Sequence, residues 1–231
     1  MLNCEQVYEL VSSDTAVEAL SIKSKEELSS MLGRDFAAMK DFDQNNPHHC
    51  YDLLNHTVHT VLNVSPNGIS HESFIELRTA ALFHDIGKPR AARKKGDRTV
   101  FYNHSSFSAE IAEKLFDEIG ITGEAAERIL FFVKHHDDFI NFKLTADSNP
   151  YIREINEKNV AAVIKKNAQE FTDMGFGIVC DAKLHILLTV LCIADAMSQS
   201  ETAYYNGTIA DTRENKVRRL EAVRDVLLKI C

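Results

Sequence analysis

The 231-residue sequence has no tryptophan and contains few glycines (9) and prolines (4). Glycine and proline form most of the tight turns that connect strands, so an all-β architecture with many turns is disfavoured. Hydrophobic residues nevertheless make up 45% of the chain. A chain of this length can bury one large core or two small ones. The composition therefore favours a mainly helical protein.

The chain also lacks a CxxC pair, and its cysteines are odd in number (5). This pattern predicts free thiols, which are typical of a reducing cytoplasm. No apolar run approaches the ~18 residues expected of a membrane span. Met1–Leu10 carries Glu5 and Glu9 instead of a basic segment followed by a long apolar run. We therefore expect a cytoplasmic protein with neither a signal peptide nor a transmembrane helix.

An excess of basic residues is missing as well. Asp and Glu (34) outnumber Lys and Arg (26), which gives a net charge of −8. Nucleic-acid-binding proteins usually carry a basic face, so tight nucleic-acid binding is not expected. The exception is the segment 90–98, which has five basic residues and a single acid, Asp97. This loop could be a lid that attracts an anionic substrate, or it could be solvated surface.

Apolar residues at helical spacing predict helices along most of the chain and no strand. A loop is expected over 139–150. The main expected helices cover residues 50–64, 71–86, 105–119, 124–134, 151–169 and 181–198, with a last helix capped by Asp211.

Residues 1–40 are expected to form a short helical extension of two or three helices. Ser24 and Glu27 have the spacing of a capping box, in which each side chain accepts a hydrogen bond from the other residue's backbone N–H. The turn-rich segment 41–47 marks a boundary with a main domain over 41–231. The predicted fold class is all-α.

A His-Asp pair, His84 and Asp85, follows an apolar helical run and is itself followed by Gly87, a plausible C-terminal cap. Neighbouring residues on a helix point about 100° apart, so one metal ion over the helix end could bind both side chains. The pair could equally be an ordinary helix end with a solvated carboxylate. Asp195 also ends a strongly apolar helix, and a buried carboxylate requires a cation, a donor or a metal.

Together with His56, these residues form a set of two imidazoles and two carboxylates from three separate helices. Such a set can hold a divalent ion and leave coordination positions for water and substrate. Imidazole and carboxylate ligands suit Fe, Mn, Co, Ni or Zn better than Ca, and Mg is possible. We therefore expect one or two divalent ions as cofactors.

The positions of His56, His84, Asp85 and Asp195 resemble the H…HD…D pattern of HD-domain metal-dependent phosphohydrolases, with HDIGK as a known variant. The sequence is more closely similar to the C-terminal HD domain of bacterial CCA-adding tRNA nucleotidyltransferases over about residues 41–200. The stretches FDQNNPHHCYDLLNHT, ALFHDIGKP and FYNHSSFSAEIAEKL carry this similarity.

The resemblance implies an all-α HD-domain helical bundle that hydrolyses a phosphomonoester or phosphodiester with metal-activated water. The expected substrate is a small phosphorylated molecule such as a nucleotide or a 2′,3′-cyclic nucleotide. Residues 1–40 are too short for a nucleotidyltransferase domain, so we expect a stand-alone HD protein and no tRNA tailing. The alternatives are a non-catalytic nucleotide sensor or interaction module, and a tRNA-processing accessory.

The resemblance also implies roles for residues around the HD pair. Asp85 and Lys88 are expected to be catalytic, with Lys88 holding a substrate phosphate. His104 and His136 are expected to bind a second ion or the phosphate, although His135 competes with His136 for this place. The further substrate-side candidates are His49 and Arg90, whereas His59 is expected at the surface.

Overall fold

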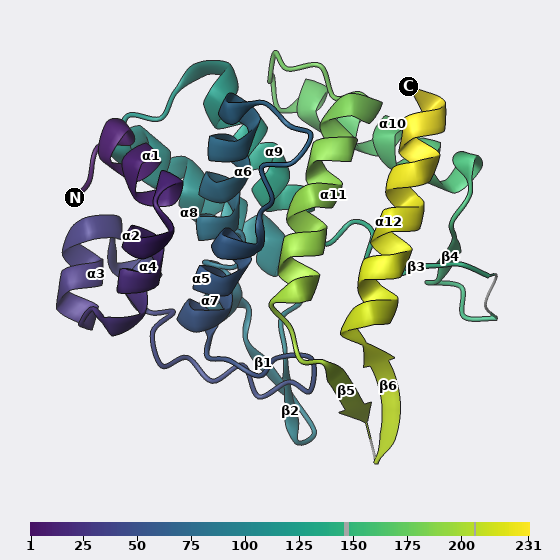
Figure 1. Ribbon diagram of the computed structural model, residues 1–231, viewed down its shortest axis with the longest axis horizontal. Helices are drawn as coiled ribbons and strands as arrows, with labels where there is room; N and C mark the ends of the chain where they lie inside the picture. Colours follow the sequence, from purple (N-terminus) through teal and green to yellow (C-terminus); the bar gives the residue numbers. More distant parts are fainter. Residues whose placement is uncertain (146–147, 206) are drawn as a thin grey trace.

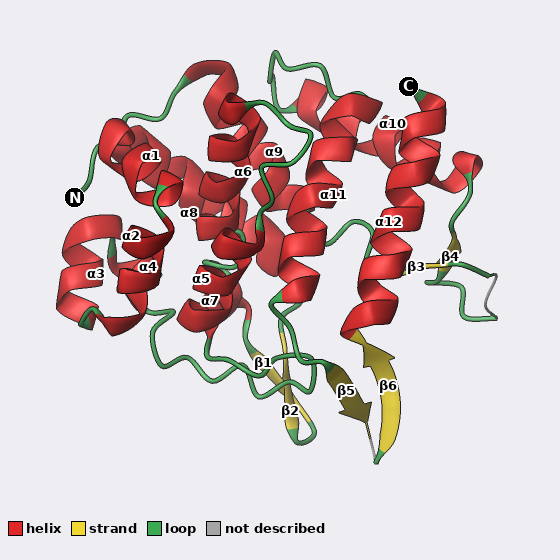
Figure 2. Ribbon diagram, viewed as in Figure 1, coloured by secondary structure: helices red, strands yellow, loops and turns green. Residues whose placement is uncertain are grey.

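The helices of this protein form from segments with apolar residues at helical spacing, and they pack side by side as a bundle (Figure 1). The computed structural model describes residues 1–145, 148–205 and 207–231. Figure 2 shows that helices dominate and that the short strands lie below the helices and at the right-hand edge of the view. The prediction of an all-α bundle is therefore confirmed.

The helices of the bundle are α1 (Cys4–Ser12), α2 (Asp14–Glu18), η1 (Ala19–Ile22), α3 (Lys25–Leu32), α4 (Arg34–Ala37), α5 (Leu53–Asn63), α6 (His71–Phe83), α7 (Lys88–Ala91), α8 (His104–Ile119), α9 (Gly123–His135), α10 (Glu157–Asp173), α11 (Ala182–Met197) and α12 (Arg213–Ile230). The strands are β1 (Arg93–Lys95), β2 (Arg98–Val100), β3 (Phe142–Lys143), β4 (Arg153–Glu154), β5 (Thr202–Tyr205) and β6 (Thr208–Thr212).

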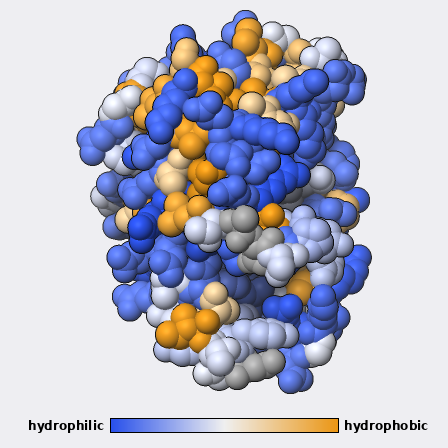
Figure 3. Space-filling view, turned by 90° about the vertical axis from the view of Figure 1, so that its right-hand side faces the viewer, coloured by the Kyte–Doolittle hydropathy of each residue, from blue (hydrophilic) through white to orange (hydrophobic). Residues whose placement is uncertain are grey.

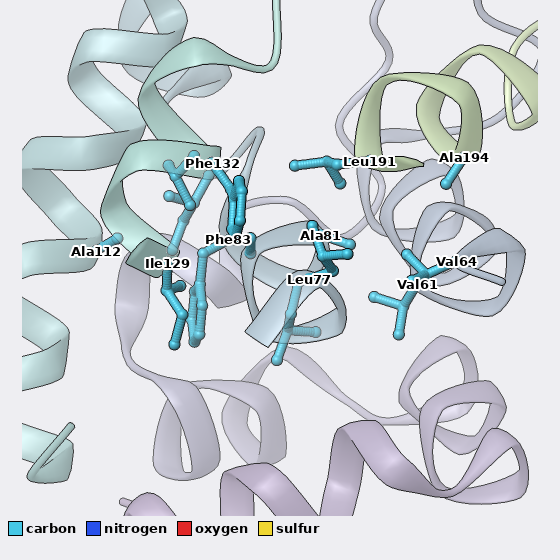
Figure 4. Packing of buried hydrophobic residues seen from close by; sticks show 14 of the residues in the cluster. Val61, Val64, Leu77, Ala81, Phe83, Ala112, Ile129, Phe132, Leu191 and Ala194 are labelled. Carbon is cyan, nitrogen blue, oxygen red and sulfur yellow. The ribbon is translucent and has the colours of Figure 1, made fainter. Parts of the chain in front are cut away.

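Helix α6 is the centre of the bundle. Every residue from Ile75 to Phe83 is buried, because α1, α5, α9 and α11 pack around this helix. Figure 4 shows Leu77, Ala81 and Phe83 pointing toward apolar side chains of the neighbouring helices. A helix that is buried on all sides must pack against every helix around it, so α6 fixes the arrangement of its neighbours.

The N-terminal helices share this core. Phe36 packs edge-on against Phe83 with ring centroids 6.2 Å apart, and Arg78 of α6 donates a hydrogen bond to the Val11 carbonyl at 2.7 Å. The predicted capping box at Ser24 and Glu27 is confirmed, with hydrogen bonds of 3.2 and 2.7 Å. Residues 1–40 are therefore packed onto the rest of the bundle. The domain boundary at residues 40 and 41 stays a prediction.

The expectation that the chain has no strand was wrong. The basic segment 90–98 contributes β1 and β2, an antiparallel hairpin, and β5 pairs with β6 in a second one. The backbone N–H of Thr99 donates to the Asn45 carbonyl at 3.0 Å, which joins the first hairpin to a loop far away in sequence. Strands of two to five residues are too short to show a period-2 pattern in the sequence. Contacts with distant segments help to stabilise them, and these contacts are not visible in the local sequence.

Several helix ends also differ from the predictions. The helix expected over 151–169 spans Glu157–Asp173, because Arg153–Glu154 pairs as a strand with Phe142–Lys143. The helix that begins at His71 ends at Phe83 instead of Ile86, and Gly87 adopts φ −83° instead of the left-handed conformation of a C-terminal cap. The last helix is capped by Thr212, while Asp211 instead forms an ion pair with Arg219 at 2.6 Å.

The five cysteines form no disulfide, as predicted. Within the described residues, no helix is long and apolar enough to span a membrane. The face of the molecule that carries α12 is mainly hydrophilic with separate hydrophobic patches (Figure 3). The loop predicted over 139–150 includes residues 146–147, which lie outside the described residues.

Gly87 generates a prediction about stability. A Cβ atom at this position would lie 2.4 Å from the Ser108 N and 2.6 Å from the His104 O, both in the backbone of α8. We expect Gly87→Ala to lower the free energy of unfolding by about 1–3 kcal/mol, because the start of α8 must move away. Gly177→Ala is the matched control, since the nearest atom to its Cβ would be 3.9 Å away. Equal thermal unfolding of the two variants would contradict this prediction.

Candidate metal centre

Three helices end and two begin at one cluster of histidines and carboxylates. His56 lies in the first turn of α5, His84 and Asp85 follow α6, and His104 begins α8. The remaining members are His136 and Asp137, which follow α9, and Asp195 near the end of α11. The fold thus brings together the six metal-binding candidates predicted from the sequence, and it adds Asp137.

The first part of the cluster contains His56, His84 and Asp195. The His56 Nε2 lies 3.0 Å from the Asp195 Oδ1, and the His84 Nε2 lies 3.8 Å from the same oxygen. The Oδ2 of Asp85 faces both histidines, at 3.4 Å from His56 Nε2 and 3.1 Å from His84 Nε2. These atoms are close enough to share one ion.

The second part of the cluster contains His104, His136 and Asp137. The other oxygen of Asp85, Oδ1, lies 3.2 Å from His104 Nε2 and 3.6 Å from His136 Nε2. Asp137 completes this group, with its Oδ2 3.2 Å from His104 Nε2. Asp85 therefore stands between two histidine pairs and offers one oxygen to each, which is the arrangement of a carboxylate that could bridge two ions.

The histidine rings are all held in the same way. The Nδ1 atoms of His84, His104 and His136 lie 2.7, 2.9 and 2.8 Å from the carbonyl oxygen three residues earlier. The His56 Nδ1 lies 3.2 Å from the Ser198 carbonyl. Because a carbonyl only accepts, each Nδ1 carries a hydrogen, and the Nε2 of the neutral ring presents a lone pair to the cluster. This is the tautomer that a metal ligand requires.

The polar atoms at the centre of the cluster lack protein partners. The Nε2 atoms of His56 and His84 and the Oδ1 of Asp85 are buried without a well-directed hydrogen bond. The Nε2 atoms of His104 and His136 face each other at 3.1 Å. Buried lone pairs that face each other are costly unless a cation lies between them. The residues present therefore fit one or two divalent transition-metal ions.

The cluster also changes the pKa of its members. Burial opposes protonation of His56, but contacts with Asp195 and Asp85 outweigh this effect and raise its pKa to about 8. Burial likewise opposes protonation of His136, whereas the charges of Asp137 and Asp85 raise its pKa to about 9. Burial would raise the pKa of Asp195, yet His56 holds it below its usual value. The cluster thus attracts positive charge, which protons and metal ions would compete to supply.

Lys88 and His49 lie beside the cluster in the same cavity. Lys88 is buried, and its Nζ donates to the Asp85 Oδ2 at 2.7 Å and to the Gln44 Oε1 at 2.9 Å. His49 lies 3.4 Å from this ammonium and packs edge-on against His56. Both predicted substrate-side residues are therefore within reach of a ligand at the cluster.

The structure does not bring Arg90 to the cavity. This residue is exposed, forms an ion pair with Glu110 at 2.9 Å and stacks on Phe107. The other basic side chains of segment 90–98 are also absent from the cavity lining. The solvated-surface interpretation of this loop therefore fits better than the lid.

Of the two neighbouring histidines His135 and His136, only His136 points its side chain into the cluster. His135 packs among Phe131 and Phe171, and its Nδ1 lies 2.9 Å from the Asp138 Oδ2. It therefore points into the core while His136 points into the cluster. His59 stacks on exposed Tyr51, as expected of a surface position.

The cavity that holds the cluster has a volume of about 630 Å³. Sequence reasoning missed four further residues of its lining, which are Gln199, Asp211, Lys216 and Arg219. It also missed Asp137, although the run HHDD gave a signal. The two middle residues of this run, His136 and Asp137, face the cluster, whereas His135 and Asp138 face the core.

Asp137 generates a prediction about metal binding. We expect Asp137→Ala to weaken binding of one Mn²⁺ ion by about tenfold or more, because the group around His104 and His136 loses its carboxylate. Isothermal titration with Mn²⁺ would measure the change. The matched control is Asp117→Ala, since Asp117 is exposed on α8. Identical Mn²⁺ titrations of wild type and Asp137→Ala would show that Asp137 is no ligand.

Comparison with known proteins supports this description of the site. The family model described as HD domain matches residues 55–199, which is more than half of the chain and includes the cluster. The chain is also 29% identical over 136 residues to a protein from Thermus thermophilus named CC-adding tRNA nucleotidyltransferase. The matched region covers 58% of this chain and 31% of that relative. The chain therefore belongs to the HD domain family, a superfamily of metal-dependent phosphohydrolases.

Proposed function

We propose that this protein is a metal-dependent phosphohydrolase that hydrolyses a phosphomonoester or phosphodiester of a nucleotide or 2′,3′-cyclic nucleotide. One observation carries the proposal. A buried carboxylate, Asp85, offers its two oxygens to two histidine pairs, and the cluster opens into a cavity of ligand size. This arrangement suits the binding of a phosphate group beside divalent ions.

The cluster residues would hold the ions, with Asp85 shared between the two groups. When bound, a divalent ion polarises phosphoryl oxygens and lowers the pKa of water. Lys88 would donate a hydrogen bond to a non-bridging phosphate oxygen, since its ammonium already lies at the cavity wall beside Asp85. A hydrogen bond from this ammonium stabilises the phosphoryl group more strongly as negative charge develops on it.

His49 would act as a neutral partner of the substrate. Burial, together with the positive charge of Lys88, holds its pKa well below the usual value, so His49 carries no proton charge at neutral pH. A neutral imidazole beside Lys88 can accept or donate a hydrogen bond without repelling the phosphate.

The rest of the cavity supports a nucleotide-sized substrate. Its lining includes apolar and aromatic side chains, among them Tyr102, Phe139, Ile140 and Leu220. A flat base or other apolar group could pack on this wall while the phosphate lies at the cluster, since pockets of about 300–1,000 Å³ bind ligands of this size. The similarity to a tRNA-modifying relative concerns a third of that protein, and the net charge of −8 disfavours tight RNA binding.

A non-catalytic nucleotide sensor is the competing proposal. The presence of every cluster position and of Lys88 in one open cavity favours an enzyme, because a sensor needs no such donor set. The two proposals predict different outcomes when the cluster is disrupted.

The test begins with protein purified without chelator, whose bound metal is measured by mass spectrometry. Nucleoside mono- and diphosphates are assayed for phosphate release, and 2′,3′-cyclic nucleotides for monoester formation by chromatography, with Mn²⁺, Fe²⁺, Co²⁺, Ni²⁺, Zn²⁺ or Mg²⁺ added. We expect Asp85→Ala to lose metal and to lower turnover by at least about 10²-fold, while the exposed control Asp117→Ala keeps both.

The hydrolase proposal would be wrong if no substrate turned over with any of these ions. It would also be wrong if Asp85→Ala retained both metal and activity. Metal-dependent nucleotide binding without turnover would favour the sensor.

A further inference from the structure

We propose that Lys216 and His48 form a second phosphate subsite in the cavity, beside the metal cluster. This inference rests on the proposed function and deepens it. It assigns the substrate to nucleotides that carry two phosphate groups, one at the cluster and Lys88, and the other at Lys216.

Lys216 lies in the first part of α12 and lines the cavity. Its Nζ donates to the Gln199 Oε1 at 2.6 Å and lies 3.1 Å from the His48 Nδ1. Both partners are neutral groups. Among the described residues, no carboxylate forms an ion pair with Lys216, although this side chain is half-buried. An ammonium that is partly removed from water favours an anionic partner.

Other cations of the cavity wall are already neutralised. Lys88 pairs with Asp85 at 2.7 Å, and Arg219 pairs with Asp211 at 2.6 Å. Lys216 differs because its ammonium has been placed between an amide and an imidazole. The carboxylates of Asp211 and Asp195 act on this ammonium without a direct ion pair, so a ligand phosphate could add the direct anionic contact.

His48 would supply a second donor. Because Lys216 donates to its Nδ1, the hydrogen of the neutral ring lies on Nε2, which can donate to a phosphate oxygen. The ring stays neutral at pH 7, since burial and the charge of Lys216 lower its pKa to about 4. The pair therefore offers two donors and one positive charge.

The subsite is connected to the metal cluster on two sides. Gln199 joins them directly, because its Nε2 donates to the Asp195 Oδ2 at 3.2 Å while its Oε1 accepts from Lys216. On the other side, the adjacent residues His48 and His49 contact Lys216 and Lys88, respectively. The amide group of Gln199 thus connects Lys216 to Asp195 of the cluster through two hydrogen bonds. This proximity suits two phosphates of one small molecule.

Lys216 lies in the C-terminal segment, outside the part of the chain that matches the family model. The HD domain match ends at residue 199, before β5, β6 and α12. Helix α12 lies alongside α11 (Figure 1) and is anchored by buried Leu220, Val223 and Leu227. A well-packed helix holds Lys216 in place, so this segment would add substrate selectivity to the family's metal site.

Binding would test the subsite independently of turnover. Protein loaded with Mn²⁺ is titrated calorimetrically with adenosine 5′-monophosphate, adenosine 5′-diphosphate and adenosine 3′,5′-bisphosphate. We expect wild type to bind at least one of the doubly phosphorylated ligands about tenfold or more tightly than the monophosphate. Lys216→Gln should remove this preference and change monophosphate affinity by less than about threefold, whereas Lys216→Arg should retain part of it.

The matched control is Arg218→Gln, which removes an exposed charge two residues along the same helix. Unfolding temperatures of all variants are compared, so that a loss of preference is not a loss of fold. The inference is overturned if neither doubly phosphorylated ligand binds more tightly than the monophosphate. It is also overturned if Lys216→Gln weakens all three ligands equally, or if Arg218→Gln has the same effect as Lys216→Gln.

The ligand is recovered after each titration and analysed by chromatography. Hydrolysis of any ligand tests the proposed function, whereas the preference for two phosphates tests the subsite. Selective binding without hydrolysis would retain the subsite and reject the hydrolase. Hydrolysis without a preference for two phosphates would retain the hydrolase and reject the subsite.

Discussion

The buried carboxylate of Asp85 is the group on which the site depends. Its two oxygens face two pairs of histidines, and one of them also accepts a hydrogen bond from Lys88. A carboxylate in this position is stable only because positive charge surrounds it, and the neighbouring His84 and Lys88 hold its pKa well below the usual value despite burial. Removing this one charge would leave the histidines without a common partner.

Helix ends provide the geometry around Asp85. Three of the histidines bond to the carbonyl three residues earlier. For His84 and His136 this carbonyl lies in the last turn of α6 or α9, where helical carbonyls have no backbone partner further along the helix. This hydrogen bond from Nδ1 to a backbone carbonyl also orients the ring so that its Nε2 faces the cluster. Gly87 then permits the close approach of α8, which carries His104. Local backbone chemistry and helix packing thus determine the positions of the proposed ligands together.

Part of the cavity lining comes from residues beyond the segment that matches the HD domain family. The metal cluster lies within the part of the chain that matches the HD domain family, whereas Lys216 and Arg219 lie beyond it. Packing of α12 along α11 brings these side chains to the same cavity. The family portion would therefore supply the hydrolytic chemistry, and the C-terminal helix would select which phosphorylated molecule enters.

Helical periodicity and residue spacing are local properties, so the sequence alone was sufficient to predict the all-α fold and the Ser24 capping box. The set His56, His84, Asp85 and Asp195 is spread along the chain, and its prediction also rested on the resemblance to the H…HD…D pattern of a known family. It also identified His104 and His136 as candidates. Tertiary structure decided which way neighbouring side chains point: His136 and Asp137 turn into the cluster, while His135 and Asp138 turn into the core. It also excluded Arg90 from the cavity and brought Lys216 into it. Such choices depend on contacts between distant segments, which no local pattern encodes.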